Sequence, residues 1–156
     1  MPTPYPVQNP LSRFNRLYVQ AQKLDRSVLP DPNAMSLATV GMSGNPSVRI
    51  VLMKDVDERG FVFYTNLDGR KGRELRTHPV AAICFHWAAL EVQVRAEGSV
   101  TTVSDKEADA DFATRPRESQ IGTWASIQSQ AIEHANELAD GVAEVEQRFL
   151  GTEVTR

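Results

Sequence analysis

The spacing of apolar side chains predicts a helix near the start of the chain. Apolar residues from Leu11 to Leu24 recur at intervals of three and four, which is the period of an amphipathic helix. Asn9 and Pro10 supply a capping side chain and a proline for the first helical position. We therefore expect a helix from Pro10 to about Asp25, ended by the proline-rich segment 29–33.

The middle of the chain has the composition of β-strands separated by turns. Its apolar runs are rich in β-branched and aromatic residues, and glycine, proline and acidic residues lie between them. In the last run, apolar and polar side chains alternate, as in a strand with one face in solvent. The expected strands cover residues 35–40, 47–53, 61–65, 80–87 and 91–103, and the first three should form an antiparallel meander.

Three more helices are expected among and after the strands. One covers 70–77 and is stopped by His78-Pro79. Another follows Ser104, which with Glu107 forms a capping box, and runs to about residue 113. The third covers about 131–150, where apolar residues again recur at three and four. These elements together predict a mainly β protein with flanking helices.

The helix expected at 70–77 opens with two cations, Arg70 and Lys71. Positive side chains are unfavourable at a helix N-terminus unless an anion lies against them. Arg49 and Lys54 lie at the ends of a preceding strand, and a short turn could bring them to the same anion. This pattern indicates a phosphate site, and a solvated basic helix end accounts for it equally well.

A polar stretch at 114–124 carries a second group of candidate ligands. Arg115, Arg117 and Ser119 surround a proline there, and arginines can fork around a phosphate or a carboxylate. Taken alone, the stretch is better interpreted as a surface loop with two ion pairs.

Composition narrows the classes of protein that remain. The 156 residues, 41% of them hydrophobic, suit one globular domain, and a net charge of −3 argues against a non-specific nucleic-acid binder. Residues 1–8 should form a flexible arm, with 9–156 as the domain. The single cysteine, Cys84, suits a reducing compartment. Without a leader pattern or a long apolar run, we expect a cytoplasmic protein with no membrane partner.

No hydrolytic or metal-binding pattern is present in the sequence. The three histidines, His78, His86 and His134, are scattered without metal-ligand spacing or a neighbouring nucleophile. Anion-binding groups on a β-scaffold that lacks a reactive group suggest that a phosphorylated cofactor supplies the chemistry.

Several motifs, in order, resemble those of the pyridoxine/pyridoxamine 5'-phosphate oxidase family. The similarity extends from about Asn9 to Phe149. The motifs are Arg49-Ile-Val-Leu-Met-Lys54, Gly60-Phe-Val-Phe-Tyr-Thr-Asn66, Arg70-Lys-Gly-Arg-Glu-Leu75, Leu90-Glu-Val-Gln-Val94 and the run from Arg115 to Ser129.

The resemblance implies a fold, a cofactor and a reaction. The fold would be a split β-barrel, antiparallel and of Greek-key type, in a homodimer with FMN at the subunit interface. The enzyme would oxidise pyridoxamine or pyridoxine 5'-phosphate to pyridoxal 5'-phosphate, in vitamin B6 metabolism. Hydride would pass to the flavin and electrons then to oxygen, giving hydrogen peroxide.

The resemblance also assigns roles to individual residues. Substrate-phosphate contacts fall on Lys54, Arg115 and Ser119, and no protein base is needed because the flavin accepts the hydride. FMN contacts fall on Arg49, Ile50, Val51, Leu52, Met53, Lys54, Tyr64, Thr65, Arg70, Lys71, Gln93, Gln128 and Ser129.

Two departures from the family pattern leave other functions open. Asp111 stands where the family usually has a tyrosine that grips the substrate phosphate, so either Asp111 turns away or substrate affinity falls. The family's C-terminal segment, with a tryptophan and an arginine near the flavin and an arginine-histidine pair near the substrate, has no counterpart in 151–156. The alternatives are a flavin- or pyridoxal-phosphate-binding protein without turnover, and a flavin reductase with another substrate.

Overall fold

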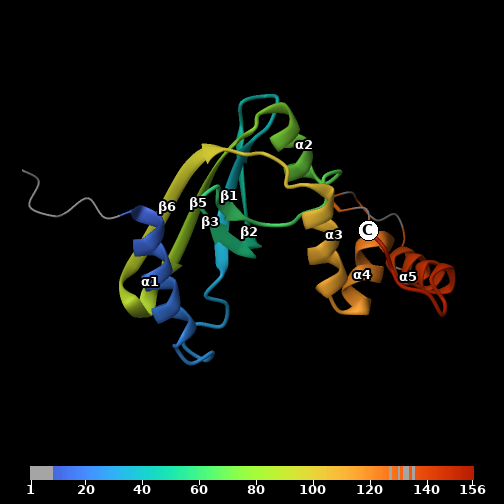
Figure 1. Cartoon of the computed structure of the whole chain (residues 1–156). Coiled ribbons are helices and arrows are strands. Elements are labelled where there is room, and N and C mark those ends of the chain that lie inside the picture. Colours follow the sequence, from blue (N-terminus) through green and yellow to red (C-terminus); the bar gives the residue numbers. More distant parts are fainter. Residues whose placement is uncertain (1–8, 127, 130, 132–133, 135) are drawn as a thin grey trace, which may run out of the picture. The chain divides into compact units, whose positions relative to one another are not determined.

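The computed structural model describes residues 9–126, 128–129, 131, 134 and 136–156. These residues form two compact units (Figure 1). The first, called the sheet unit, comprises the chain up to Tyr64 together with Val80–Ser99. The second, called the helical unit, comprises Thr65–Pro79 and Val100–Arg156. The arm expected at residues 1–8 lies outside the described residues, and a single domain over 9–156 stays a prediction.

The sheet unit is built on antiparallel strands, as the sequence predicts. A four-stranded sheet has the order β2-β1-β5-β6, and β3 pairs with β4 in a separate two-stranded sheet. The expected meander of the first three strands is therefore wrong, because β4 pairs with β3 in that second sheet and does not continue the sheet of β1 and β2. Leu37 of β1 lies opposite Arg49 of β2 and Ile83 of β5. The bounds are β1 Ala34–Val40, β2 Pro46–Leu52, β3 Asp55–Asp57, β4 Gly60–Val62, β5 Val80–Trp87 and β6 Val92–Ser99, with a 3-10 turn, η1, at Ala88–Leu90.

Helix α1, Pro10–Gln22, packs its apolar stripe into the core of the sheet unit. Asn9 caps it as expected, accepting a hydrogen bond from the Leu11 amide at 2.9 Å. Phe14 lies among aromatic rings, with its ring centre 5.1 Å from that of Phe85 and 5.8 Å from that of Trp87. Burial of these large rings accounts for much of the unit's hydrophobic stabilisation.

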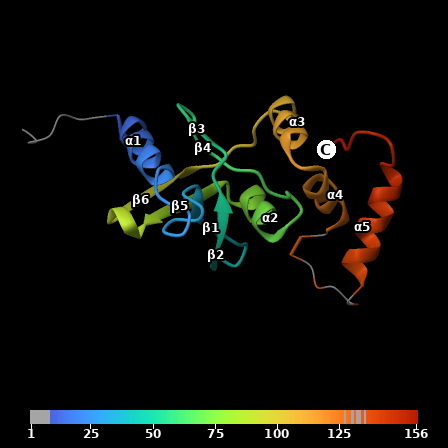
Figure 2. The same cartoon turned by 90° about the horizontal axis from the view of Figure 1, so that it is seen from below.

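The helical unit contains α2 Arg70–Thr77, α3 Asp105–Thr114, α4 Arg117–Ala125 and α5 Glu137–Arg148. Its core consists of Phe112, Ile121 and Val154, and Val142 and Phe149 pack against it. Helices α4 and α5 lie side by side, and both labels can be followed in Figure 2. Ser104 caps α3 as expected, accepting from the Glu107 amide at 3.2 Å.

One expectation for the helical unit is wrong, because the polar stretch 114–124 is largely helix α4 and not a surface loop. Pro116 occupies the position before the helix, where its lack of an N–H costs nothing. Gln120 is buried and donates from Nε2 to the Phe112 carbonyl at 2.8 Å, beside the buried Ile121. A helix whose buried face includes a glutamine lacks the apolar periodicity that would have predicted it.

Other differences concern the ends of elements. β6 ends at Ser99 and not at residue 103, and the strand expected at 61–65 ends at Val62. Its partner β3 lies between the strands expected at 47–53 and 61–65 and was not predicted. The last helix begins at Glu137 and not near residue 131, and residues 132, 133 and 135 of the expected helix lie outside the described part.

Candidate functional site

The loop before α2 presents the basic helix start that the sequence singles out. Asn66 organises a tight turn, because its Oδ1 accepts from the Asp68 amide at 2.8 Å. Helix α2 then begins after Gly69, with no side-chain cap and no acidic residue in its first turn. The first amides of a helix have no intrahelical partner, so this end offers N–H donors and positive potential to an anion.

The two cations of this turn have different partners. Arg70 donates from Nε to Oε1 of Glu74 at 2.8 Å, and Glu74 is buried. Part of the charge of Arg70 is therefore balanced within the helix, as in the alternative of a solvated basic helix end. Lys71 instead reaches Gln128, donating from Nζ to Oε1 at 2.6 Å.

Gly69 allows Gln128 to lie close to the helix start. A Cβ at Gly69 would stand 2.7 Å from Gln128 Oε1, closer than side chains tolerate. Ser129, which follows Gln128, has a φ of 67°, a left-handed backbone conformation that is uncommon for a serine. The structure thus brings together Lys71 and Gln128, two of the residues that the sequence assigns to FMN. Sequence reasoning missed Gly69, whose only signal is its place before the basic turn.

Thr65 supplies a further polar group in the loop that leads to α2. Among the described residues, its Oγ1 is one of two buried side-chain polar atoms that have no hydrogen-bond partner, the other being His78 Nδ1. Leaving a buried hydroxyl unsatisfied costs free energy unless a ligand completes it. A hydroxyl, an ammonium and helix N-terminal amides are the donors that bind phosphate groups. The residues present in the helical unit therefore fit the phosphate of a nucleotide cofactor.

The other candidates at 49–54 belong to the sheet unit and alternate between the two faces of β2. Arg49 lies on the face of the core, and its guanidinium donates to Thr39 Oγ1 at 2.5 Å and to Ser47 Oγ at 2.6 Å. Val51 and Met53 face the same way as Arg49. Met53 is buried and Val51 is half-buried. Ile50 and Leu52 point outward and are exposed. Side chains of this run cannot all reach one ligand on one face of the strand.

The remaining candidates of the sheet unit lie on or next to strands. Gln93 is exposed on β6 and donates from Nε2 to Cys84 Sγ at 3.4 Å. Lys54 is exposed and its amide donates to the Val62 carbonyl at 2.8 Å, while Tyr64 is half-buried just after β4.

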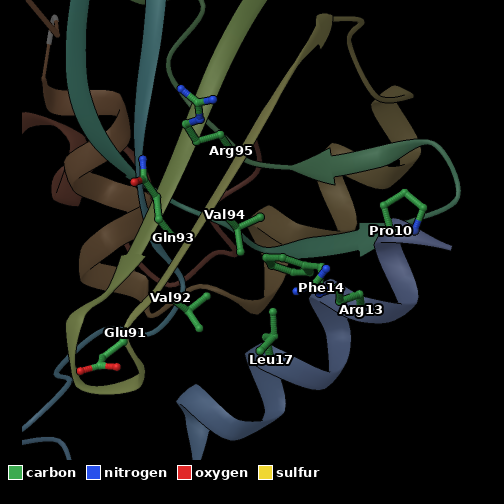
Figure 3. A pocket seen from close by; sticks show the side chains of 9 residues that line it. All are labelled: Pro10, Arg13, Phe14, Leu17, Glu91, Val92, Gln93, Val94 and Arg95. Atoms are coloured by element: carbon green, nitrogen blue, oxygen red, sulfur yellow. The ribbon is translucent and has the colours of Figure 1, made fainter. Parts of the chain in front are cut away.

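A pocket lies between α1 and β6, and Gln93 is part of its lining (Figure 3). Phe14 and Leu17 of α1 face Val92 and Val94 of β6, whereas Gln93 extends away from them on the strand. The apolar contacts across this pocket continue the core of the sheet unit.

At the polar stretch 114–124, the structure pairs Arg115 with Asp111. Asp111 Oδ2 accepts from Arg115 Nε at 3.0 Å and from Nη2 at 2.7 Å. Ser119, the other candidate, is exposed in the first turn of α4. Arg117 holds the chain after α5 instead, donating to the Thr152 carbonyl at 2.8 Å and to the Phe149 carbonyl at 2.7 Å.

The described part of the chain contains neither a metal-binding cluster nor a membrane-spanning helix. No group of three or more histidine, cysteine and acidic residues is placed there to hold a metal ion. Within the same residues, no helix has the length and apolar character needed to cross a membrane.

Comparison with known proteins identifies relatives of the chain. The family model described as pyridoxamine 5'-phosphate oxidase matches residues 22–149. A pyridoxine/pyridoxamine 5'-phosphate oxidase of Myxococcus xanthus (strain DK1622) is 54% identical over 148 residues, which cover 95% of this chain and 70% of the relative. One from Rhodopseudomonas palustris (strain HaA2) is 52% identical over 150 residues, which cover 96% of this chain and 69% of the relative.

Solved structures show the same fold. PhzG from Burkholderia lata 383, in complex with tetrahydrophenazine-1-carboxylic acid, superposes with a TM-score of 0.86 at 26% identity, over 97% of this chain and 72% of PhzG. A pyridoxamine 5'-phosphate oxidase-related, FMN-binding protein from Nostoc punctiforme PCC 73102 has a TM-score of 0.63 at 16% identity, over 86% of this chain and 73% of that protein.

These comparisons confirm the fold predicted from the sequence. The antiparallel sheet with flanking helices is a split β-barrel of the FMN-binding type. The family also supports FMN as the cofactor. With its match to most of the family model and about half of its residues identical to those of curated members, the chain belongs to the pyridoxamine 5'-phosphate oxidase family.

Proposed function

We propose that this protein is an FMN-dependent oxidase that converts pyridoxamine or pyridoxine 5'-phosphate to pyridoxal 5'-phosphate, with oxygen as the electron acceptor. The family and the names of relatives about 50% identical support this assignment. The structural observation that supports it most is the contact between Lys71 and Gln128 at the start of α2.

The start of α2 is the proposed binding site for the phosphate of FMN. Lys71 Nζ supplies a charge that Gln128 Oε1 orients at 2.6 Å, and Thr65 Oγ1 is a buried hydroxyl without a hydrogen-bond partner among the described residues. The amides of the first helical turn, which have no partner within the helix, add dipolar attraction for a dianion. Arg70 contributes long-range charge, with its guanidinium held along the helix by Glu74.

The proposed substrate contacts are Lys54, Arg115 and Ser119. A phosphate remote from the reacting carbon gives binding energy that orients the carbon without taking part in the chemistry. Arg115 can fork two N–H groups around a phosphate, and Ser119 can add a hydroxyl donor. These residues therefore act in positioning.

Bound FMN would supply the redox chemistry, taking a hydride from the substrate and passing the electrons to oxygen. The task of the chain's own residues is to bind the two phosphates, orient the rings and hold charge nearby. No residue in the proposed set has to act as a general base.

We further propose that the protein is a homodimer and that the outer face of β2 takes part in the interface. β2 is an edge strand, and its outward residues Val48, Ile50 and Leu52 are 69%, 64% and 43% exposed. A row of large aliphatic side chains on an edge strand is unfavourable in water and favours association.

A second candidate function is a flavin enzyme whose substrate carries a carboxylate in place of the phosphate. Asp111 already occupies Arg115, which weakens the case for a phosphate at that position. The structural neighbour PhzG is bound to a carboxylic acid. The much higher identity to the oxidases favours the first proposal.

Turnover with defined substrates tests the proposal. The FMN-loaded protein is mixed with pyridoxamine 5'-phosphate in air, and pyridoxal 5'-phosphate and hydrogen peroxide are measured. We expect equal amounts of both products. Flavin reduction by a nicotinamide, with no product from either B6 phosphate, would favour a reductase and contradict the oxidase.

A further inference from the structure

Asp111 and Arg115 form a partly buried ion pair in the helical unit. Their side chains are 15% and 24% exposed, and their shortest N–O distance is 2.7 Å. The Arg115 guanidinium also lies 5.5 Å from the centre of the Phe112 ring, and Phe112 is buried. The guanidinium is therefore held from two directions.

The geometry of this pair determines which edge of the guanidinium is occupied. Oδ2 of Asp111 accepts from both Nε and Nη2 of Arg115. This edge is one of those with which an arginine forks around a carboxylate or a phosphate. An anionic ligand that used it would have to displace Asp111 or share the edge with it.

Asp111 also has a structural reason to stay where it is. It lies in the last turn of α3, where the helix dipole disfavours a negative charge. Arg115 offsets that cost, and the backbone carbonyl of Asp111 is tied by a hydrogen bond from Thr114 Oγ1 at 2.7 Å. The carboxylate therefore remains beside the guanidinium unless a stronger anion replaces it.

We propose that Asp111 is a specificity-determining residue that competes with the substrate phosphate for Arg115. The inference rests on the proposed function, because it takes Arg115 as a substrate contact. With Asp111 present, its carboxylate occupies the Nε and Nη2 edge of Arg115 and repels a dianion, so the site favours a phosphorylated ligand less than it would without Asp111. Without the carboxylate, this edge is open to the phosphate and one negative charge beside it is gone.

The test compares ligand binding to the FMN-loaded wild type and to Asp111→Asn. The probes are 4-deoxypyridoxine 5'-phosphate and 4-deoxypyridoxine, which lack the group to be oxidised, and calorimetry gives their dissociation constants. With the dielectric constant of water, a unit charge about 4 to 6 Å from a dianion changes binding by about ten- to thirtyfold. We expect affinity for the phosphorylated probe to rise by about that factor in Asp111→Asn, with the unphosphorylated probe unchanged.

Two controls separate this role from general effects of charge or folding. Asp109→Asn removes the same charge from the same helix, but Asp109 pairs with Arg156, so affinity should stay at the wild-type value. Asp111→Glu keeps the charge and should keep affinity low. The gain in Asp111→Asn should shrink as salt is added, which a merely structural change would not do.

Arg115→Ala distinguishes failure of this inference from failure of the proposed function. If Arg115→Ala weakens binding of the phosphorylated probe while Asp111→Asn leaves it unchanged, the competition is disproved and the substrate site stands. If Arg115→Ala leaves binding unchanged, Arg115 does not bind the phosphate, and both the substrate site and the role of Asp111 are wrong.

Discussion

Lys71 Nζ lies 2.6 Å from Gln128 Oε1, although 57 residues separate the two in the sequence. The contact joins the first turn of α2 to the segment that follows α4. Because Gln128 accepts from the ammonium, it fixes the direction in which the charge points. An oriented charge binds an anion at lower entropic cost than a freely rotating lysine.

Replacing the two cations of α2 should affect flavin binding unequally. Lys71→Ala should raise the dissociation constant of FMN by about tenfold or more, since a charge-assisted contact is lost. Arg70→Ala should cost less, because Arg70 is already paired with Glu74. Fluorescence titration of the apoprotein with FMN measures both. Arg76→Ala, at the other end of the helix, is the control, and an effect as large as that of Lys71→Ala would contradict the assignment.

Thr65→Val should separate stability from binding. Valine has nearly the shape of threonine and removes a buried hydroxyl that has no hydrogen-bond partner among the described residues, so the free energy of unfolding of the apoprotein should rise by about 1 kcal/mol. FMN affinity should fall at the same time, because the protein loses a hydroxyl that can donate a hydrogen bond to the phosphate. Thermal unfolding with and without FMN checks both effects. A variant with a less stable apoprotein would show that the hydroxyl has a protein partner after all.

Two glycines around the start of α2 should differ in their tolerance of alanine. A Cβ at Gly72 would overlap the backbone of Leu67, whereas a Cβ at Gly69 would chiefly meet the movable side chain of Gln128. Gly72→Ala should therefore destabilise the protein by about 1–2 kcal/mol despite its better helix propensity. Gly69→Ala should cost less stability and still weaken FMN binding by displacing Gln128. Urea unfolding and FMN titration measure the two quantities, and equal stabilities would argue against this packing.

The outer face of β2 should control assembly. Val48→Asp places a charge in the exposed apolar row, so a dimer held by this face should dissociate. Val28→Asp makes the same change at a site that is 57% exposed in a turn and should leave the dimer intact. Analytical ultracentrifugation distinguishes the two. If Val48→Asp is as dimeric as the wild type, the interface lies elsewhere.

The sequence predicts most elements of the fold because local signals mark them. Asn9 caps α1, Ser104 caps α3, and α2 has the predicted bounds. Helix α4 escaped prediction because Gln120, a polar residue, faces its core and only a tertiary hydrogen bond to Phe112 explains that burial.

Prediction of the site was limited by contacts that are distant in the sequence. The motifs identify Lys71 and Gln128 as candidates, but local pattern cannot show that they touch. Asp111 and Arg115 are only four residues apart, and this spacing permits their contact on a helix without fixing it. The absence of a partner for the Thr65 hydroxyl among the described residues follows only from the packing around it.

The reductive half-reaction tests the central claim most directly. The visible spectrum of the FMN-loaded protein is recorded before and after pyridoxamine 5'-phosphate is added without oxygen. We predict that the flavin absorbance bleaches and that it returns when air is admitted, since the substrate delivers a hydride that oxygen later removes. A bound flavin that stays oxidised with saturating pyridoxamine and pyridoxine 5'-phosphates would contradict the proposed oxidase.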